Sequence, residues 1–296
     1  CVYTVPNNVS KYIYVLKLLQ SSKLTSIQIV PSIIKLAKQL LSKLSFPDLR
    51  NCILTGEATH IDLLTGWIKA IPNSKVYNYY GPTETTIYCS YYDCNCDKLK
   101  SYNGMLAIGR PLGNMKLFVV DGDFKEVGEG IKGELLISGD QVTRGYLNNF
   151  LRNRESFINL TLGGVTTTFY RSGDLCYKDK DDDIYYCDRM DNQVKVQGFR
   201  VELSEIEVLV RKGFNINNIV LPIENRSGTN ELVLFIEDFM HDGNNGEAVI
   251  SFLESKLPQY MLPGKVIYLK NFPLGSSGKT DKKQLRELVE NGFELN

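Results

Sequence analysis

Helical and extended signals alternate through the first eighty residues, and this alternation limits the possible fold more than any other feature of the chain. Apolar residues recur at helical spacing over Ile33–Leu44, a short buried-strand pattern covers Asn51–Leu54, a second helix is predicted over Ile61–Ile71, and Lys75–Tyr79 has an extended pattern. An αβαβ order implies a mostly parallel sheet with helices packed on its faces. We therefore expect the chain to begin with an α/β region.

The pattern changes near residue 105. Short β-rich runs, separated by Gly and Asp turns, cover Lys116–Asp121, Glu134–Ser138 and Ile184–Cys187. Such runs predict an antiparallel sheet or a small barrel. From residue 192 the pattern changes again: an extended Gln193–Val196 segment precedes a capping box at Ser204–Glu207, which predicts the start of a helix.

Further strand and helix signals after residue 215 complete a compact α+β unit at the C-terminal end of the chain. We place the boundary between the two parts at Asp191. The predicted domains are therefore residues 1–191 and residues 192–296, with the α/β and β-rich regions together in the first.

Composition excludes several classes of function. The 34 Lys and Arg residues balance 34 Asp and Glu residues, so the chain lacks the basic excess that nucleic acids and anionic lipids attract. No apolar run approaches the length of a membrane span. The 7 cysteines form no CxxC pair, which favours reduced thiols in the cytoplasm. We expect a cytoplasmic protein that binds neither nucleic acid nor membrane.

Two glycine motifs match the sequence patterns of nucleotide-binding loops, but their context argues against that function. Gly128-x-Gly130-x-x-Gly133 opens a predicted strand, whereas a dinucleotide fingerprint must open a helix. Gly278-Lys279-Thr280 has Pro273 where a Walker loop needs its first glycine, and too few residues follow for a mononucleotide fold. Another role is needed for Lys279.

The segment Asn78–Glu84 comes where a predicted strand ends, and it combines an aromatic ring, a hydroxyl and a carboxylate. At the carboxyl edge of a parallel sheet, these groups suit a magnesium nucleotide. Two later charged segments, Tyr170–Leu175 and Asp188–Asp191, are predicted turns whose carboxylates could hold a ribose. Taken singly, each also fits a turn-capping Asp or a surface ion pair.

Taken together and in order, these segments resemble the core motifs of the acyl-adenylate-forming superfamily, which includes nonribosomal peptide synthetase adenylation domains, acyl-CoA synthetases and luciferases. The residues of two motifs, Gly81–Glu84 and Gln193–Lys195, are more similar to the amino-acid-activating branch than to the acyl-CoA synthetases or the luciferases. The resemblance implies the C-terminal part of a large α/β and β-barrel domain over residues 1–191 and a small mobile α+β domain over residues 192–296. The matching blocks are Asn78–Glu84, Gly133–Gly139 with Arg144–Leu147, Tyr170–Leu175, Asp188–Glu202, Leu257–Pro263 and Gly278–Lys279.

The resemblance also implies a role for each matching residue. Tyr80 would stack on adenine, Asn78 and Gly81 would lie at the nucleotide, Thr83 would bind the α-phosphate, and Glu84 would bind Mg²⁺. Asp174 and Arg189 would hold the ribose, Lys279 would reach both the substrate carboxylate and the α-phosphate, and Asp191 would be the hinge. The catalytic residues would then be Lys279, Glu84 and Thr83, and the acid pocket would be lined by Gln28, Ile53, Thr55, Tyr79, Ile87 and Tyr88.

The implied activity is the activation of a carboxylic acid, above all an amino acid, with ATP and Mg²⁺ to an acyl-adenylate and pyrophosphate. Transfer to the phosphopantetheine thiol of a peptidyl carrier protein would follow. An acyl- or aryl-CoA ligase and a non-catalytic remnant remain as alternatives, because residues 1–77 contain nothing like the superfamily's Ser/Thr/Gly-rich phosphate loop. We expect the chain to be about the C-terminal three fifths of an enzyme, with little activity by itself.

Overall fold

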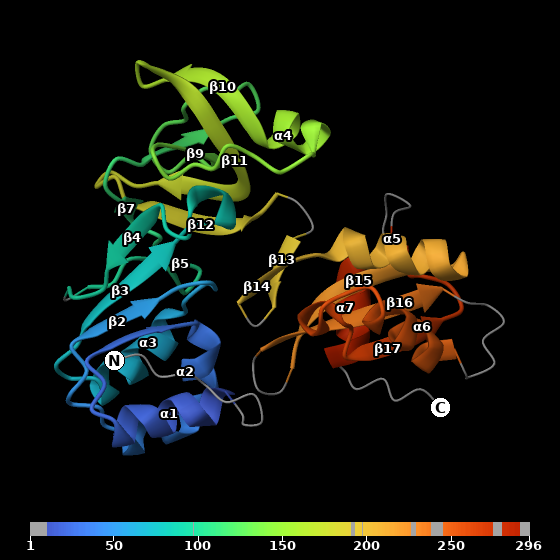
Figure 1. Ribbon diagram of the computed structural model, residues 1–296, viewed down its shortest axis with the longest axis horizontal. Coiled ribbons are helices and arrows are strands. Elements are labelled where there is room, and N and C mark those ends of the chain that lie inside the picture. The colour runs from blue at the N-terminus through green and yellow to red at the C-terminus, as the bar shows by residue number, and fades with distance from the viewer. Residues whose placement is uncertain are drawn as a thin grey trace. The chain divides into compact units, whose positions relative to one another are not determined.

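The computed structural model describes residues 11–96, 98–190, 193–196, 198–225, 229–237, 245–274 and 280–290 (Figure 1). The chain divides into two compact units, Cys1–Asp191 and Asn192–Asn296, and each is described by itself. In the first unit the helices are α1 (Lys11–Ser21), α2 (Pro31–Ala37), the 3-10 helix η1 (Lys38–Lys43), α3 (Ile61–Ala70), the 3-10 helix η2 (Thr83–Thr85) and α4 (Phe150–Ser156).

The strands of the first unit belong to three sheets. The first sheet has the order β1-β2-β3-β4-β7, the second has the order β10-β11-β9-β8 with β12 paired to β11, and the third is the pair β5-β6. Their bounds are β1 (Ser26–Ile29), β2 (Asn51–Leu54), β3 (Lys75–Tyr80), β4 (Ser90–Asp93), β5 (Ser101–Tyr102), β6 (Met105–Leu106), β7 (Arg110–Pro111), β8 (Lys116–Val120), β9 (Gly133–Ser138), β10 (Phe157–Leu162), β11 (Val165–Lys178) and β12 (Ile184–Arg189).

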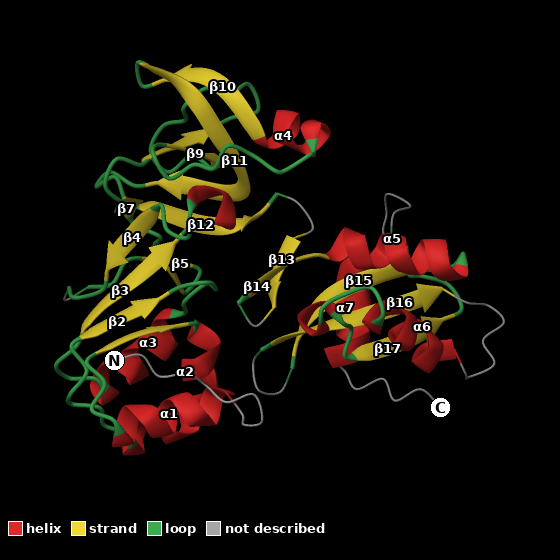
Figure 2. Cartoon of the chain, in the orientation of Figure 1, coloured by secondary structure: helices red, strands yellow, loops and turns green. Residues whose placement is uncertain are grey.

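The first sheet is the predicted α/β region. Strands β1, β2 and β3 run parallel, and β4 and β7 continue the sheet in antiparallel pairs. Figure 2 shows helices α1, α2 and α3 grouped beside these strands. Their apolar side chains form one core with the sheet, in which the Trp67 indole N–H donates to Cys52 Sγ at 3.3 Å. This core holds the carboxyl ends of β2 and β3 in fixed positions.

One helix prediction in this region was only partly right. The periodic segment from residue 33 to residue 44 forms α2 and then continues as the 3-10 helix η1 instead of one α-helix. Pro31 occupies the first turn of α2, where its missing N–H costs nothing.

The second sheet is antiparallel throughout. Of the two predicted alternatives, an antiparallel sheet and a small barrel, it is described by the first. Strand β9 starts at Gly133, so the motif Gly128-x-Gly130-x-x-Gly133 leads into a strand, as expected. The prediction of turns at 170–175 and at Asp188–Arg189 was wrong. Residues 170–175 lie within β11, which has an irregular register between Arg171 and Leu175, and Asp188 and Arg189 lie within β12.

The second unit is an α+β unit. Strands β15 and β16 are antiparallel, and β16 and β17 are parallel, in a sheet of order β15-β16-β17 beside the hairpin β13-β14. The elements are β13 (Gln193–Val196), β14 (Phe199–Glu202), α5 (Leu203–Phe214), β15 (Asn217–Glu224), β16 (Asn230–Glu237), α6 (Asn245–Glu254), the 3-10 helix η3 (Gln259–Met261), β17 (Lys265–Leu269) and α7 (Lys282–Glu290).

Alternating side chains of β15 and β16 form two separate cores in the second unit. Val220 and Leu234 pack with α5 and α6, whereas Leu221 and Phe235 pack with Leu285 of α7. Strand periodicity therefore places helices on both faces of this sheet.

The capping-box prediction was wrong in detail. Helix α5 begins at Leu203 and has no side-chain cap, and the Glu207 carboxylate instead accepts the backbone N–H of Val220 at 3.0 Å. A tertiary hydrogen bond therefore replaces the local one.

Two further observations concern the whole set of described residues. No described helix is long and apolar enough to cross a membrane. The six cysteines in the described part of the chain, Cys52, Cys89, Cys94, Cys96, Cys176 and Cys187, are free thiols.

Candidate active site

The loop after β3 begins the site. Strand β3 ends at Tyr80, and the chain turns at Gly81 and Pro82 into η2. A side chain at position 81 would overlap the Ile87 carbonyl oxygen and would lie only 2.8 Å from Tyr88 Cα. Glycine is required at Gly81 because the returning segment packs directly against it.

The returning segment has an unusual backbone. Thr86 and Ile87 have φ values of 54° and 80°, and the Tyr88 N–H donates to the Thr86 carbonyl at 3.2 Å. This i→i+2 bond closes a γ-turn at Ile87. A β-branched residue at positive φ costs about 1–3 kcal/mol, and such residues are concentrated at functional sites.

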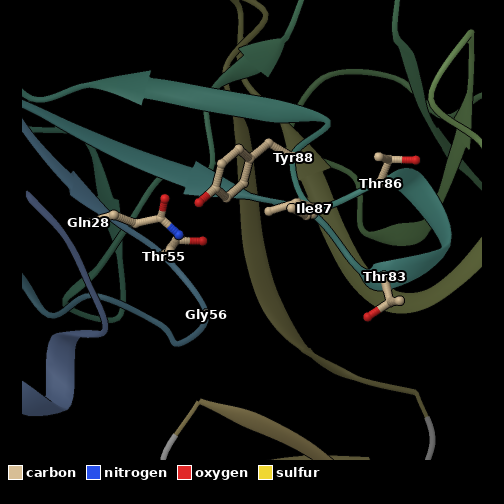
Figure 3. A pocket seen from close by; sticks show the side chains of 8 residues that line it. Gln28, Thr55, Gly56, Thr83, Thr86, Ile87 and Tyr88 are labelled. Carbon is tan, nitrogen blue, oxygen red and sulfur yellow. The ribbon is translucent and has the colours of Figure 1, made fainter. Parts of the chain in front are cut away.

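A pocket of about 480 Å³ opens between this loop and the carboxyl ends of β1 and β2. Figure 3 shows the Tyr88 hydroxyl directed toward the Gln28 and Thr55 side chains at one side, with Thr83 at the other. The lining residues are Gln28, Thr55, Gly56, Gly81, Thr83, Thr86, Ile87 and Tyr88. One cavity therefore joins most of the predicted acid-binding residues to the predicted phosphate-binding loop.

Among the described residues, the side chains that line the pocket are polar or apolar and none is charged. Burial raises the pKa of Tyr88, and the Thr55 and Gln28 side chains beside its hydroxyl oppose that rise. Within the described residues, Tyr88 Oη is buried with no partner in hydrogen-bonding geometry. A ligand group that pairs with this oxygen would remove a cost of about 1–3 kcal/mol.

The predicted ribose-binding residues are neighbours in the second sheet. Asp174 and Arg189 are ladder partners of β11 and β12, and Arg189 Nη1 donates to Asp174 Oδ1 at 2.7 Å. The same Nη1 donates to the Ser172 carbonyl at 2.7 Å. Gly173, at a φ of 68°, forms part of the irregularity that precedes Asp174.

Tyr80 connects this pair to the first sheet, because its hydroxyl donates to Asp174 Oδ2 across 94 residues of sequence. The ring is only 8% exposed and packs in an apolar cluster with Cys89 and Ile108. Burial, followed by the Asp174 charge, raises the pKa of Tyr80 well above its ordinary value, so the phenol stays protonated and donates. Burial also raises the pKa of Cys89 to about 12, which makes this thiol a poor nucleophile.

Asn78 is committed to contacts inside the unit. Its amide nitrogen donates to the Ala107 carbonyl at 2.9 Å, and its amide oxygen accepts the Thr59 hydroxyl at 3.0 Å. The oxygen keeps a second lone pair for another donor. These bonds fix the end of β3 against the segments that precede β7 and α3.

Glu84 is a buried carboxylate in η2, with 8% of its surface exposed. Tyr146 Oη donates to Glu84 Oε1, and the Thr143 N–H donates to the Glu84 carbonyl at 2.8 Å. The described residues contain no group of three or more His, Cys, Asp or Glu side chains that could enclose a metal ion. The single carboxylate fits Mg²⁺, which keeps several waters and binds substrate phosphates through one or two protein carboxylates.

Other predicted site residues lie outside this arrangement. Ile53 and Tyr79 do not line the pocket, although the Tyr79 ring packs edge-on against Tyr88 at a centroid distance of 5.0 Å. Lys279 and Asp191 fall outside the described residues, so the catalytic lysine and the hinge stay predictions.

Sequence reasoning missed Gly56 and Thr86 in the pocket and Tyr146 at Glu84. For Tyr146 a signal was present, because Arg144–Leu147 belongs to one of the resembling blocks, but nothing in that block names Glu84 as its partner.

Comparisons with known proteins show which family and which fold this chain resembles. Residues 1–147 match the family model of the AMP-binding enzymes. The chain is 32% identical over 275 residues to tyrocidine synthase 3 of Brevibacillus parabrevis, and the match covers 92% of this chain and 4% of that protein. This chain belongs to the AMP-binding enzyme family.

The D-alanine--D-alanyl carrier protein ligase of Bacillus licheniformis is 30% identical over 82% of this AMP-binding chain, which spans 48% of that ligase. Among solved structures, the Vibrio cholerae adenylation domain AlmE in complex with glycyl-adenosine-5'-phosphate has a TM-score of 0.81 and 29% identity, with 93% of this chain and 52% of that one covered. A nonribosomal peptide synthetase protein containing adenylation and PCP domains has a TM-score of 0.82 at 23% identity, over 94% of this chain and 47% of that one. The fold is therefore the adenylation-domain fold, and the chain spans about half the length of these ligase and adenylation-domain chains.

Proposed function

We propose that this chain belongs to an enzyme that activates an amino acid with ATP. The carboxylate oxygen of the acid attacks the α-phosphorus, the bond from that phosphorus to pyrophosphate breaks, and an aminoacyl-adenylate forms. One observation carries the proposal: a single pocket joins Gln28, Thr55 and Tyr88 to Gly81 and Thr83 of the turn after β3. A carboxylic acid at the first group has its reactive carboxylate directed toward a phosphate at the second.

Each remaining group has a role in this reaction. The Asp174 carboxylate, oriented by Arg189 and Tyr80, accepts the ribose hydroxyls, and the Thr83 hydroxyl donates to an α-phosphate oxygen. Because the attack brings two anions together, a cation that is preorganised at the developing charge lowers the barrier. We assign this role to Lys279.

Glu84 is the residue that would hold Mg²⁺. When bound, the metal ion polarises the phosphoryl oxygens and screens the charge of the leaving pyrophosphate. The side chain that we assign to this ion is already buried and hydrogen-bonded in η2. A carboxylate oriented before the ion arrives loses less entropy on binding it.

The second step passes the acyl group to the phosphopantetheine thiol of a carrier protein, and AMP leaves. The relatives support this partner: one is named a carrier protein ligase, and one solved neighbour contains a PCP domain. We assign residues 1–191 to the large adenylation domain, residues 192–296 to the small domain, and Asp191 to the hinge between them. The free thiols of the described residues fit a cytoplasmic enzyme.

ATP–pyrophosphate exchange with the full-length protein that carries this sequence tests the proposal. We expect exchange that depends on one amino acid from a panel, and Lys279→Ala should lower the rate at least about 100-fold, as removal of a transition-state donor does. Lys270→Ala is the matched control, because Lys270 is an exposed lysine of the same unit. Absence of exchange with every acid, or an unchanged rate in Lys279→Ala, would contradict the proposal.

The nature of the acceptor needs its own measurement. Loading of the labelled acid onto a phosphopantetheinylated carrier protein, compared with formation of its CoA thioester, separates a synthetase from a CoA ligase. The proposal expects the carrier protein to be loaded and CoA to be a poor acceptor.

A further inference from the structure

The segment that follows β9 is built around one asparagine. Asn153 of α4 accepts the Tyr146 N–H at its Oδ1 atom at 2.6 Å and donates from its Nδ2 atom to the Tyr146 carbonyl at 2.8 Å. Gly145 precedes Tyr146 at a φ of 121°, and a side chain there would lie 2.6 Å from Asn153 Oδ1. The backbone of Tyr146 is therefore held on both sides by one side chain.

The Tyr146 ring is held as firmly as its backbone. It packs edge-on against Phe157 at a centroid distance of 5.7 Å, and Phe157 packs on Tyr170 of β11 at 5.3 Å. This packing directs the hydroxyl to Glu84 Oε1, 62 residues earlier in the chain. With the Thr143 N–H on the Glu84 carbonyl, the same segment holds both the side chain and the backbone of Glu84.

We propose that Tyr146 is a positioning residue for Glu84, and that Asn153 fixes Tyr146 for this purpose. The inference rests on the proposed function in one respect, the assignment of Glu84 to Mg²⁺. A hydrogen bond from a fixed phenol restricts the rotamer of a carboxylate, while the remaining lone pairs of the two oxygens can bind a cation. Partners of this kind change metal affinity about 10- to 100-fold when they are removed.

Direct metal binding tests the inference without relying on turnover. Binding of Mn²⁺ is measured by electron paramagnetic resonance on the full-length protein with a non-hydrolysable α,β-methylene analogue of ATP. We expect Tyr146→Phe to raise the Kd for Mn²⁺ about tenfold or more. The Mg²⁺ concentration for half-maximal exchange should rise in parallel, with the KM for the amino acid unchanged.

Three further variants complete the design. Asn153→Ala keeps the Tyr146 hydroxyl and should weaken Mn²⁺ binding less than Tyr146→Phe does, because only the backbone clamp is lost. Tyr185→Phe is the matched control, since Tyr185 Oη donates to the Asp179 carboxylate at 2.9 Å elsewhere in the same unit. It should leave Mn²⁺ binding unchanged. Glu84→Gln should weaken binding at least as much as Tyr146→Phe.

Two results would overturn the inference, and they differ in what else they overturn. A Kd for Mn²⁺ that rises in Glu84→Gln and is unchanged in Tyr146→Phe removes the positioning role alone. A Kd that is unchanged in Glu84→Gln removes the metal role of Glu84, and the positioning role with it. Thermal unfolding of each variant shows whether the folded enzyme is the species that is titrated.

Discussion

At the scale of single residues, the Tyr88 hydroxyl is the group of the pocket that the proposed function assigns most directly to the amino acid. It is buried, it faces Gln28 and Thr55, and it lacks a partner in hydrogen-bonding geometry among the described residues (Figure 3). A polar side chain of the bound amino acid would pair with this hydroxyl, whereas an apolar side chain would leave it buried and unpaired. Under the proposed function, Gln28, Thr55 and Tyr88 would offer hydrogen bonds to a polar group of the amino acid.

Tyr88→Phe should raise the KM for the amino acid about three- to tenfold, because one hydrogen bond to the amino acid is lost. The KM for ATP should not change. Stability of the free enzyme should not fall, because the change removes an unpaired buried oxygen. The control is Tyr91→Phe, since the Tyr91 ring packs against Tyr79 at 5.8 Å but does not line the pocket. Equal KM values for wild type and Tyr88→Phe would contradict this assignment.

The same region shows where residue-level prediction ends. Gln28, Thr55 and Tyr88 were found through the resemblance, and they do line one pocket. The positive φ values of Thr86 and Ile87 had no signal in the sequence, because β-branched residues avoid that conformation. The contact between Tyr146 and Glu84 depends on the packing of α4 and β10, which local patterns do not encode.

At the scale of secondary-structure elements, short segments with a clear strand or helix pattern were predicted best. Strands β2 and β13 have the predicted bounds, and α3 differs from its prediction by one residue at its end. Strand β11 was missed because Gly173 and its neighbours have turn chemistry that the sheet accommodates as an irregular register. Helix α5 starts without its predicted cap because Val220 offers Glu207 a tertiary partner.

The turn between β11 and β12 contains a charged cluster that makes a stability prediction possible. Lys100 Nζ contacts the carboxylates of Asp179, Asp181 and Asp183 at 2.9, 2.8 and 2.6 Å. Burial alone raises the pKa of Asp179, but hydrogen bonds from Lys100 and then from Tyr185 outweigh it and lower the pKa below 3.8. The cluster fastens this turn to the segment before β5.

Because the folded pKa of Asp179 lies below the unfolded value of 3.8, its contribution to stability is present above pH 3.8 and is lost as the pH falls through the folded pKa. Asp179→Asn should therefore flatten the acid limb of a plot of unfolding free energy against pH. At neutral pH, Lys100→Met should cost about 1–3 kcal/mol in urea unfolding, because Asp179 and Asp181 lose this cation and Asp183 keeps only Arg110, at 3.3 Å. Lys98→Met, at a nearby exposed lysine, should cost much less. Equal effects of the two lysine substitutions would show that the cluster does not stabilise the fold.

At the scale of the whole molecule, the chain consists of two units with separate apolar cores. The clusters around Trp67, Tyr170 and Phe169 belong to residues 1–191, and those around Leu234 and Phe235 belong to residues 192–296. The α/β and α+β classes followed from periodicity in the sequence. The placement of Lys279, on which the proposed chemistry depends, lies outside the described residues and stays a prediction.

The central claim is that an oxygen of the acid attacks the α-phosphorus of ATP. It is tested most directly with an amino acid labelled with ¹⁸O in its carboxylate, incubated with ATP and the full-length protein in the presence of a thiol acceptor. The oxygen that bridges the acyl and phosphoryl groups stays with phosphorus when the thiol attacks the acyl carbon. Adenylation therefore predicts AMP that carries one ¹⁸O atom from the acid, beside unlabelled pyrophosphate. Label in inorganic phosphate with release of ADP, or AMP without label, would contradict it.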